Sequence, residues 1–160
     1  MATANAATTF LENRLLRFIF KNNDASFSSP GDGIYVGLAT AVADFNNTTG
    51  ESAATQNQIT EATFGDYARK QITAANWNIT TDTDDTQKIT NGGDIDFLPS
   101  TGTQNVITHV FITTASGTTT LDTVGAGGNV LFIGALDVAK TIQTGDIFRI
   151  NQGNLSIELK

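Results

Sequence analysis

The segment NVITHVFITTA, residues 105–115, carries the clearest strand pattern in the sequence. Its side chains alternate between two faces, and both faces are largely apolar. One face holds Val106, Thr108, Val110 and Ile112, and the other holds Ile107, His109, Phe111 and Thr113. A strand that is apolar on both faces is covered by protein on both sides. We therefore expect this segment to be the central strand of a sheet.

Shorter strand patterns surround this segment. They are IYVGLAT at 34–40, DYARKQITAANWNIT at 66–80, KITNGGDIDFLP at 88–99, and four runs between residues 129 and 159, namely NVLFIGAL, AKTIQT, DIFRI and NLSIEL. Turn residues at GGN, TGD and NQGN punctuate the last runs. Many short strands spaced by roughly 8 to 12 residues are typical of sandwiches and jelly rolls. The sequence thus predicts an all-β fold, an antiparallel β-sandwich or jelly-roll-like domain.

One helix is expected near the N-terminus, after a tail of residues 1–8. Thr9 and Glu12 have the spacing of a capping box, and apolar residues recur at helical spacing through Leu11, Leu15, Phe18 and Ile19. This pattern predicts a helix within residues 9–22. Leu16 and Phe20 lie on another face of it, which suggests burial on two sides, against the sheet and a loop or against another subunit.

A long polar stretch follows the first strand. Residues 41–64 are rich in Asn, Thr, Ala and Gln and show little periodicity. Loops beyond roughly 12 to 15 residues are uncommon inside compact domains. We expect a loop or arm here, either an excursion that contacts a neighbouring subunit or a plain flexible loop. Residues 65–160 then form the main β-sandwich portion of a single domain spanning residues 1–160.

Charge and composition limit the kinds of partner. The chain has 9 basic and 16 acidic residues, a net charge of −7, which disfavours nucleic acid and anionic membrane surfaces as partners. It has no cysteine, which excludes disulfides and thiol catalysis. The N-terminus resembles no secretory signal, and no stretch reaches the roughly 18 apolar residues of a membrane span.

Candidate catalytic groups are few. His109 is the only histidine and lies within a strand, which favours a core or interface role over catalysis. Asp82, Asp84 and Asp85 lack the later ligands of a calcium loop, so a solvated acidic turn is the better interpretation. Asp94 and Asp96 share one strand face without a recognisable substrate groove. We expect no enzyme, no metal site and no cofactor; a metal-dependent hydrolase using Asp82, Asp84, Asp94 and Asp96 is the alternative.

The order of five segments is similar to that of a known group of proteins. These segments are FLENRLLRFIF, IYVGLAT, YARKQIT, ITHVFITTA and the closing stretch GGNVLFIGALDVAKTIQTGDIFRINQGNLSIEL. Together they resemble short tailed-phage virion proteins that are labelled tail fibre or structural proteins. The chain departs from that pattern at Lys70, where the group has glutamine, and in its longer and more polar 41–64 segment.

The resemblance implies a virion component assembled in the host cytoplasm. The first possibility is a head decoration, or cement, protein that binds the major capsid protein and neighbouring copies. Decoration proteins commonly surround three-fold axes, so the resemblance also implies a homotrimer. The alternative is a tail fibre, tail-tip or collar subunit that binds the host, for which Trp77 could stack on a sugar; a core position for Trp77 is the other interpretation.

A set of apolar and hydrogen-bonding residues is expected to form the interface, because aromatic residues and arginine contribute most to interface energy. Leu11, Leu15 and Phe18 serve equally well as ordinary core of this chain. The predicted interface residues are Leu11, Leu15, Phe18, Phe20 and Phe45 as apolar anchors and Tyr67 and Arg69 as a hydrogen-bonding corner.

Overall fold

A computed structural model of the chain describes residues 5–7, 20, 33–43, 59–81, 87–102, 104–117, 121 and 130–158. Its strands are β1 (Asn5–Ala7), β2 (Ile34–Val42), β3 (Ile59–Glu61), β4 (Lys70–Ile72), β5 (Trp77–Thr81), β6 (Gln87–Asn91), β7 (Ile95–Asp96), β8 (Asn105–Thr113), β9 (Val130–Ile142), β10 (Arg149–Ile150) and β11 (Ser156–Glu158). Within these ranges, helical structure is confined to Phe20 and the short 3-10 helix η2 (Ala74–Asn76). All strand pairs are antiparallel, which confirms the predicted all-β, antiparallel class.

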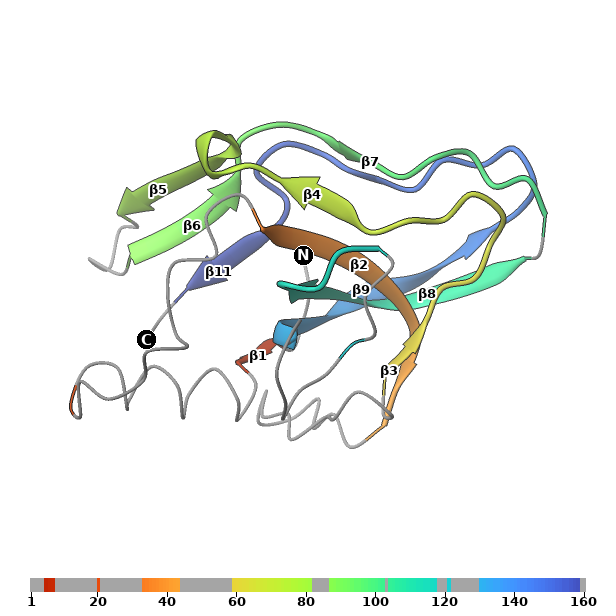
Figure 1. Cartoon of the computed structure of the whole chain (residues 1–160), viewed down its shortest axis with the longest axis horizontal. Helices are drawn as coiled ribbons and strands as arrows, with labels where there is room; N and C mark the ends of the chain where they lie inside the picture. Colours follow the sequence, from red (N-terminus) through yellow and green to blue (C-terminus); the bar gives the residue numbers. More distant parts are fainter. Residues whose placement is uncertain are drawn as a thin grey trace.

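The largest sheet has the strand order β1-β9-β8-β2-β3, and β4 also pairs with β2. Strand β8 lies in its middle, between β2 and β9 (Figure 1). The prediction that NVITHVFITTA is a central strand is therefore confirmed. Its flanking partners are the two other long strands of nine and thirteen residues.

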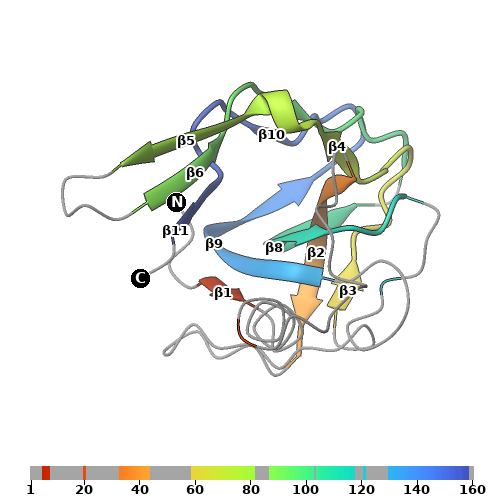
Figure 2. The ribbon, with the colours of Figure 1, turned by 60° about the vertical axis from the view of Figure 1, so that its left-hand side comes forward.

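A two-stranded ribbon, β7 with β10, and a three-stranded sheet in the order β11-β6-β5 complete the fold. Figure 1 shows β7, and Figure 2 shows its partner β10, on one side of the large sheet, and both figures show β5 and β6 together at the edge of the molecule. The layer over the large sheet is thus built from short strands and connecting segments. The expectation of a regular β-sandwich or jelly roll stays a prediction.

Apolar side chains pack on both faces of the large sheet. The main core cluster fills the face covered by the β7–β10 ribbon and consists of Val36, Leu38, Ala62, Phe64, Ile72, Ile95, Phe97, Ile107, Val110, Ile112, Ile142, Phe148 and Ile150. The second core cluster consists of Ala39, Ile59, Phe111, Ala115, Leu121, Val130 and Ile133. Consecutive residues such as Leu38 and Ala39 fall in different clusters because strand side chains alternate between faces.

The strict alternation expected along β8 is wrong at its centre. Ile107 pairs with Lys140 of β9, whereas His109 pairs with Ala135, so the register shifts between them. A bulge of this kind leaves residues unpaired and changes which face the next side chains occupy. Ile107 therefore joins Val110 in the main core cluster, although the sequence pattern places them on opposite faces.

Several segment boundaries also differ from the sequence prediction. The predicted strand 66–80 divides into β4, η2 and β5, and the predicted strand 88–99 divides into β6 and β7 around Gly92 and Gly93. Conversely, NVLFIGAL and AKTIQT belong to one long strand, β9. Short turns and bulges, which leave the apolar pattern intact, are responsible for these differences.

The predicted loop 41–64 is wrong at both ends. Strand β2 continues to Val42, and Ile59–Glu61 forms β3 against it, with a register shift between Ala39 and Ala41. Beyond β3, Phe64 is almost fully buried. A three-residue strand is too short to show alternation, so only its pairing with β2 reveals it. The predicted helix 9–22 lies outside the described residues except for Phe20, as does Phe45.

One glycine is required by close packing. Gly37 of β2 pairs with Phe111 of β8, and a Cβ atom at position 37 would lie 2.2 Å from the Phe111 ring. The ring is fully buried and has no space to retreat. The lack of a side chain at Gly37 therefore leaves room for the far end of the Phe111 ring over the partner strand.

The substitution Gly37→Ala should lower the free energy of unfolding by roughly 1 to 3 kcal/mol, because the added methyl overpacks the site. Chemical denaturation of the purified protein measures this. Gly93→Ala is the matched control, since a Cβ there meets nothing within 4 Å; its change should stay within about 0.5 kcal/mol. Equal losses in the two variants would contradict the packing argument.

Candidate functional site

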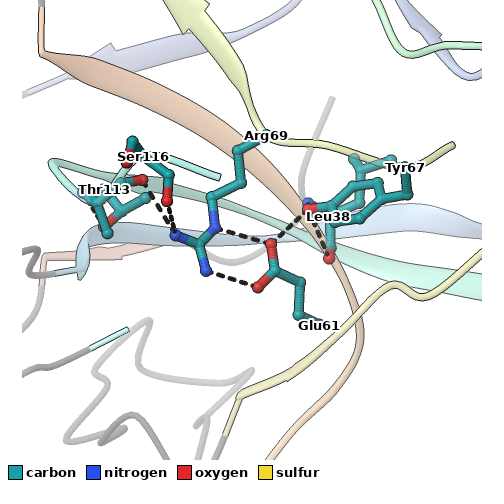
Figure 3. A network of polar contacts seen from close by, with 7 residues as sticks. Leu38, Glu61, Tyr67, Arg69, Thr113 and Ser116 are labelled. Carbon is teal, nitrogen blue, oxygen red and sulfur yellow. Dashed lines mark hydrogen bonds and ion pairs between the residues drawn. The ribbon is translucent and has the colours of Figure 1, made fainter. Parts of the chain in front are cut away.

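The two predicted hydrogen-bonding residues, Tyr67 and Arg69, lie together in the segment between β3 and β4. The structure adds a third member, Glu61 at the end of β3, which the sequence analysis missed. Figure 3 shows the three side chains converging between β2 and the segment after β8. We refer to Glu61, Tyr67 and Arg69 as the polar corner.

Arg69 makes a two-point contact with Glu61. Its Nε lies 2.8 Å from Glu61 Oε1 and its Nη2 lies 2.7 Å from Oε2. Nη1 donates to the carbonyl oxygens of Ala115 and Ser116 at 3.1 and 2.7 Å. The guanidinium carbon also lies 5.9 Å from the centre of the Phe111 ring, within the range of a cation–π contact. Arg69 thus connects the 67–69 segment to β3 and to the end of β8.

The charge of Arg69 is compensated inside the protein. Its side chain is only 5% exposed and that of Glu61 25%. A buried guanidinium is tolerated when a carboxylate and further acceptors satisfy its donors. The polar corner therefore has the geometry of a structural ion pair.

Tyr67 links the same carboxylate to the central sheet. Its hydroxyl lies 2.8 Å from Glu61 Oε1, to which it donates, and it accepts from the backbone N–H of Leu38 at 2.9 Å. Burial, together with the nearby Glu61 charge, raises the pKa of Tyr67 far above its ordinary value. The phenol stays protonated and acts as a fixed hydrogen bond donor.

Aromatic stacking extends the polar corner into the core. The Tyr67 ring lies 5.2 Å from the Phe64 ring, edge on, and 5.9 Å from the Phe97 ring, stacked; Phe97 in turn contacts Phe148 at 5.9 Å. Such contacts contribute beyond simple area burial. The contacts of Tyr67 described here all lie within the chain, and its role in an interface stays a prediction.

The other predicted interface residues divide into two groups. Phe20 is described and its side chain is 78% exposed, which leaves a phenyl ring in water. Leu11, Leu15, Phe18 and Phe45 lie outside the described residues. Further large apolar side chains that the sequence analysis did not select are exposed, namely Ile79, Val138, Ile147, Leu98 and Val106.

Asp94 and Asp96, weighed as paired carboxylates, face Arg149 across the β7–β10 ribbon. Arg149 Nε and Nη2 lie 2.5 and 2.7 Å from the two Asp96 oxygens, and Nη1 lies 3.8 Å from Asp94. Asp94 also accepts from the backbone N–H of Gln152 at 2.8 Å. The hydrogen bonds from Arg149 lower the pKa of Asp96 below its ordinary value. Both carboxylates thus have partners within the chain.

His109 and Trp77 also have structural surroundings. The His109 Nδ1 atom lies 2.7 Å from the Thr108 hydroxyl, and burial lowers the pKa of its imidazole, which is neutral at pH 7. Trp77 is partly buried and packs against the main core cluster. Within the described ranges, His, Asp and Glu side chains form no group of three or more that could hold a metal ion. Nor does the described part contain a helix long and apolar enough to cross a membrane.

The burial of the Glu61–Arg69 ion pair predicts that loss of its carboxylate destabilises the protein more than loss of an exposed carboxylate. Glu61→Gln keeps the side-chain size but leaves the Arg69 charge without its carboxylate, so the free energy of unfolding should fall by about 3 kcal/mol. Denaturant unfolding measures the loss. Asp96→Asn is the control, because it disrupts a similar two-point pair whose side chains are about half exposed. Its loss should be much smaller; a similar loss in both variants would show that the burial of Arg69 is unimportant.

His109 predicts a pH dependence of stability. Because burial makes its imidazole harder to protonate in the folded state than in the unfolded chain, protons bind preferentially to the unfolded state. Stability should therefore be constant above the ordinary histidine pKa of about 6.5 and decline as the pH falls toward 5.5. Unfolding curves at a series of pH values measure the slope. His109→Gln should remove it, since the chain has no other histidine; an unchanged slope would assign it to other groups.

Comparison with known proteins gives the chain a family. Its sequence matches the family model described as podophage GP4 fiber I protein gp80 over residues 6–158. No curated protein matches the chain. The family is one of structural fibre proteins of the phage, which points away from enzymatic activity. Because the match covers nearly all of the 160 residues, the chain belongs to the podophage GP4 fiber I protein gp80 family and is a phage virion structural protein.

Proposed function

We propose that the chain is a fibre subunit of the virion, attached through protein–protein contacts at the tail or collar. The observation that carries this proposal is the family match over residues 6–158, whose description names a fibre protein. Of the two virion positions expected from the sequence, a fibre position agrees with that description directly. A head decoration protein bound to the major capsid protein is the second candidate.

The described surface supports attachment to other proteins. Phe20, Ile79 and Val138 expose 78%, 71% and 66% of their surface, respectively. Covering exposed phenylalanine and isoleucine side chains with a partner removes apolar surface from water and lowers the free energy of the complex. The net charge of −7 disfavours DNA and anionic lipid as that partner. We therefore propose protein surfaces of the virion as the binding partners.

Two observations support a scaffolding role over a sugar-binding one. Trp77, the only tryptophan, is partly buried against the main core cluster, which reduces the surface that it could stack on a sugar. The polar corner and the Asp94 and Asp96 carboxylates are occupied by contacts within the chain. Accordingly, the subunit holds neighbouring proteins in place, and host recognition would belong to another part of the fibre.

The compact body supports the second candidate, a cement protein. Its described strands are antiparallel and often join segments distant in the sequence, and they include no elongated repeat of the kind from which fibrous shafts are built. Cement proteins surround the three-fold positions of a shell, and a homotrimer belongs to this second proposal. The two positions differ in the number of copies that a particle requires.

Copy number distinguishes the two candidates. Quantitative mass spectrometry of purified virions, with the major capsid protein as internal reference, should give a few dozen copies or fewer per particle, because a tail has few symmetry-related positions. Gold-labelled antibody against this chain should bind at the tail end of the particle in electron micrographs. Hundreds of copies with label over the head would instead establish the cement function.

A further inference from the structure

Strand β5 (Trp77–Thr81) forms the outer edge of the three-stranded sheet, where it pairs with β6 alone among the described strands. Figures 1 and 2 both place it at the periphery of the molecule. It is five residues long, and the other edge strands in the described part have at most three. Four of its five residues are exposed.

This edge lacks the usual protection against strand pairing. Natural edge strands carry charged residues, proline or bulges, which discourage contact with other strands. The sequence of β5 is WNITT, with no charge and no proline, and its pairing with β6 has no register shift. Strands β3 and β4, at the edge of the large sheet, carry Glu61 and Lys70. The β5 edge is therefore open to a further strand.

The hydrogen-bonding pattern defines which backbone groups point outward. Gly92 N–H donates to the Asn76 carbonyl at 2.7 Å, and Trp77 pairs with Asn91. Because hydrogen-bonded pairs alternate along an antiparallel ladder, Asn78 and Thr80 direct their backbone groups toward β6. Ile79 and Thr81 direct theirs away from it. The Trp77 N–H is already used, since it donates to the Ala74 carbonyl, while the Trp77 carbonyl points outward.

The side chain of Ile79 continues an apolar row across the sheet. Ile79 pairs with Ile89 of β6, and Ile89 pairs with Ile157 of β11. Ile157 packs against the main core cluster, whereas Ile79 at the far end is 71% exposed. The row thus runs from the protein interior to an uncovered isoleucine at the open edge.

We propose that the open edge of β5 pairs with β5 of a second copy of this chain, antiparallel and centred on Ile79. A two-fold axis at Ile79 would place Ile79 of one copy opposite Ile79 of the other. The backbone N–H of each Ile79 would then donate to the backbone carbonyl of the other. Thr81 N–H would donate to the Trp77 carbonyl of the second copy, which is the outward acceptor left at that position. The edge is therefore complementary to itself.

Pairing with a second copy also fits the charges. Each chain carries a net charge of −7, so contact between copies is opposed wherever charged surfaces meet. Strand β5 is neutral and brings no like charges into direct opposition. The result would be a continuous six-stranded sheet with six isoleucines in one row. Its interface is small, so the affinity of free chains should be weak and increase where copies are held close together in a particle.

The absence of cysteine allows a direct test. In Ile79→Cys, the paired residues would have Cα atoms about 5.5 Å apart, a separation that a disulfide spans. Under mild oxidation the full-length variant should form covalent dimers at least tenfold faster than two controls. Asn78→Cys is on the same strand but would be opposite Thr80 of the other copy, and Val138→Cys is another exposed position.

A second measurement uses the protein without cysteine. Sedimentation velocity at increasing concentration should show a monomer–dimer equilibrium that Ile79→Lys abolishes and Val138→Lys leaves unchanged. Equal oxidation rates at all three cysteine positions would overturn the proposal. So would a sedimentation experiment in which the chain without substitutions remains monomeric or forms only trimers. Because these tests use the isolated chain, their result is independent of whether the protein lies at the tail or on the head.

Discussion

The fold depends on the need to cover strand β8 on both faces. Val110 and Ile112 project into the main core cluster and Phe111 into the second, and all three are almost fully buried. Pairing with β2 and β9 satisfies much of the backbone of β8 but leaves the two faces of the sheet to be covered by other segments. Hydrophobic burial on two sides of one strand therefore positions the described segments that contribute to the two core clusters.

Covering a sheet with short strands and loops requires that their backbone groups find partners, because buried unsatisfied groups are costly. Buried polar side chains supply several of them. Asn105 accepts from the N–H groups of Thr63 and Phe64 at 2.6 and 2.9 Å. Asn91, which is 1% exposed, donates to two carbonyls and accepts from Leu155 N–H. The polar corner performs the same task for the Leu38 N–H, through Tyr67, and for the Ala115 and Ser116 carbonyls, through Arg69.

These polar contacts explain how the described part of the chain accommodates charged groups in its interior. The Arg69 charge is neutralised by Glu61, and Tyr67 is held as a neutral donor. An arrangement of this kind stabilises one conformation of a loop and holds no group ready to exchange protons with a substrate. It agrees with a virion structural protein, whose function rests on a stable surface.

The sequence by itself determined the class of the fold, its central strand and its family resemblance. Strong apolar alternation at residues 105–115 and in IYVGLAT depends only on local periodicity, which the sequence displays directly. Tyr67 and Arg69 were identified as hydrogen-bonding residues from their residue types; both bond to Glu61 within the chain, and their part in an interface stays a prediction.

Tertiary structure decided the features that depend on residues distant in the chain. The β8–β9 bulge, the three-residue strand β3 and the position of Glu61 beside Arg69 leave no periodic signal, because they arise from pairing between segments. The need for glycine at position 37 follows only from the Phe111 ring on the neighbouring strand. Likewise, the open edge of β5 is a property of the sheet, since an edge exists only once the strand order is known.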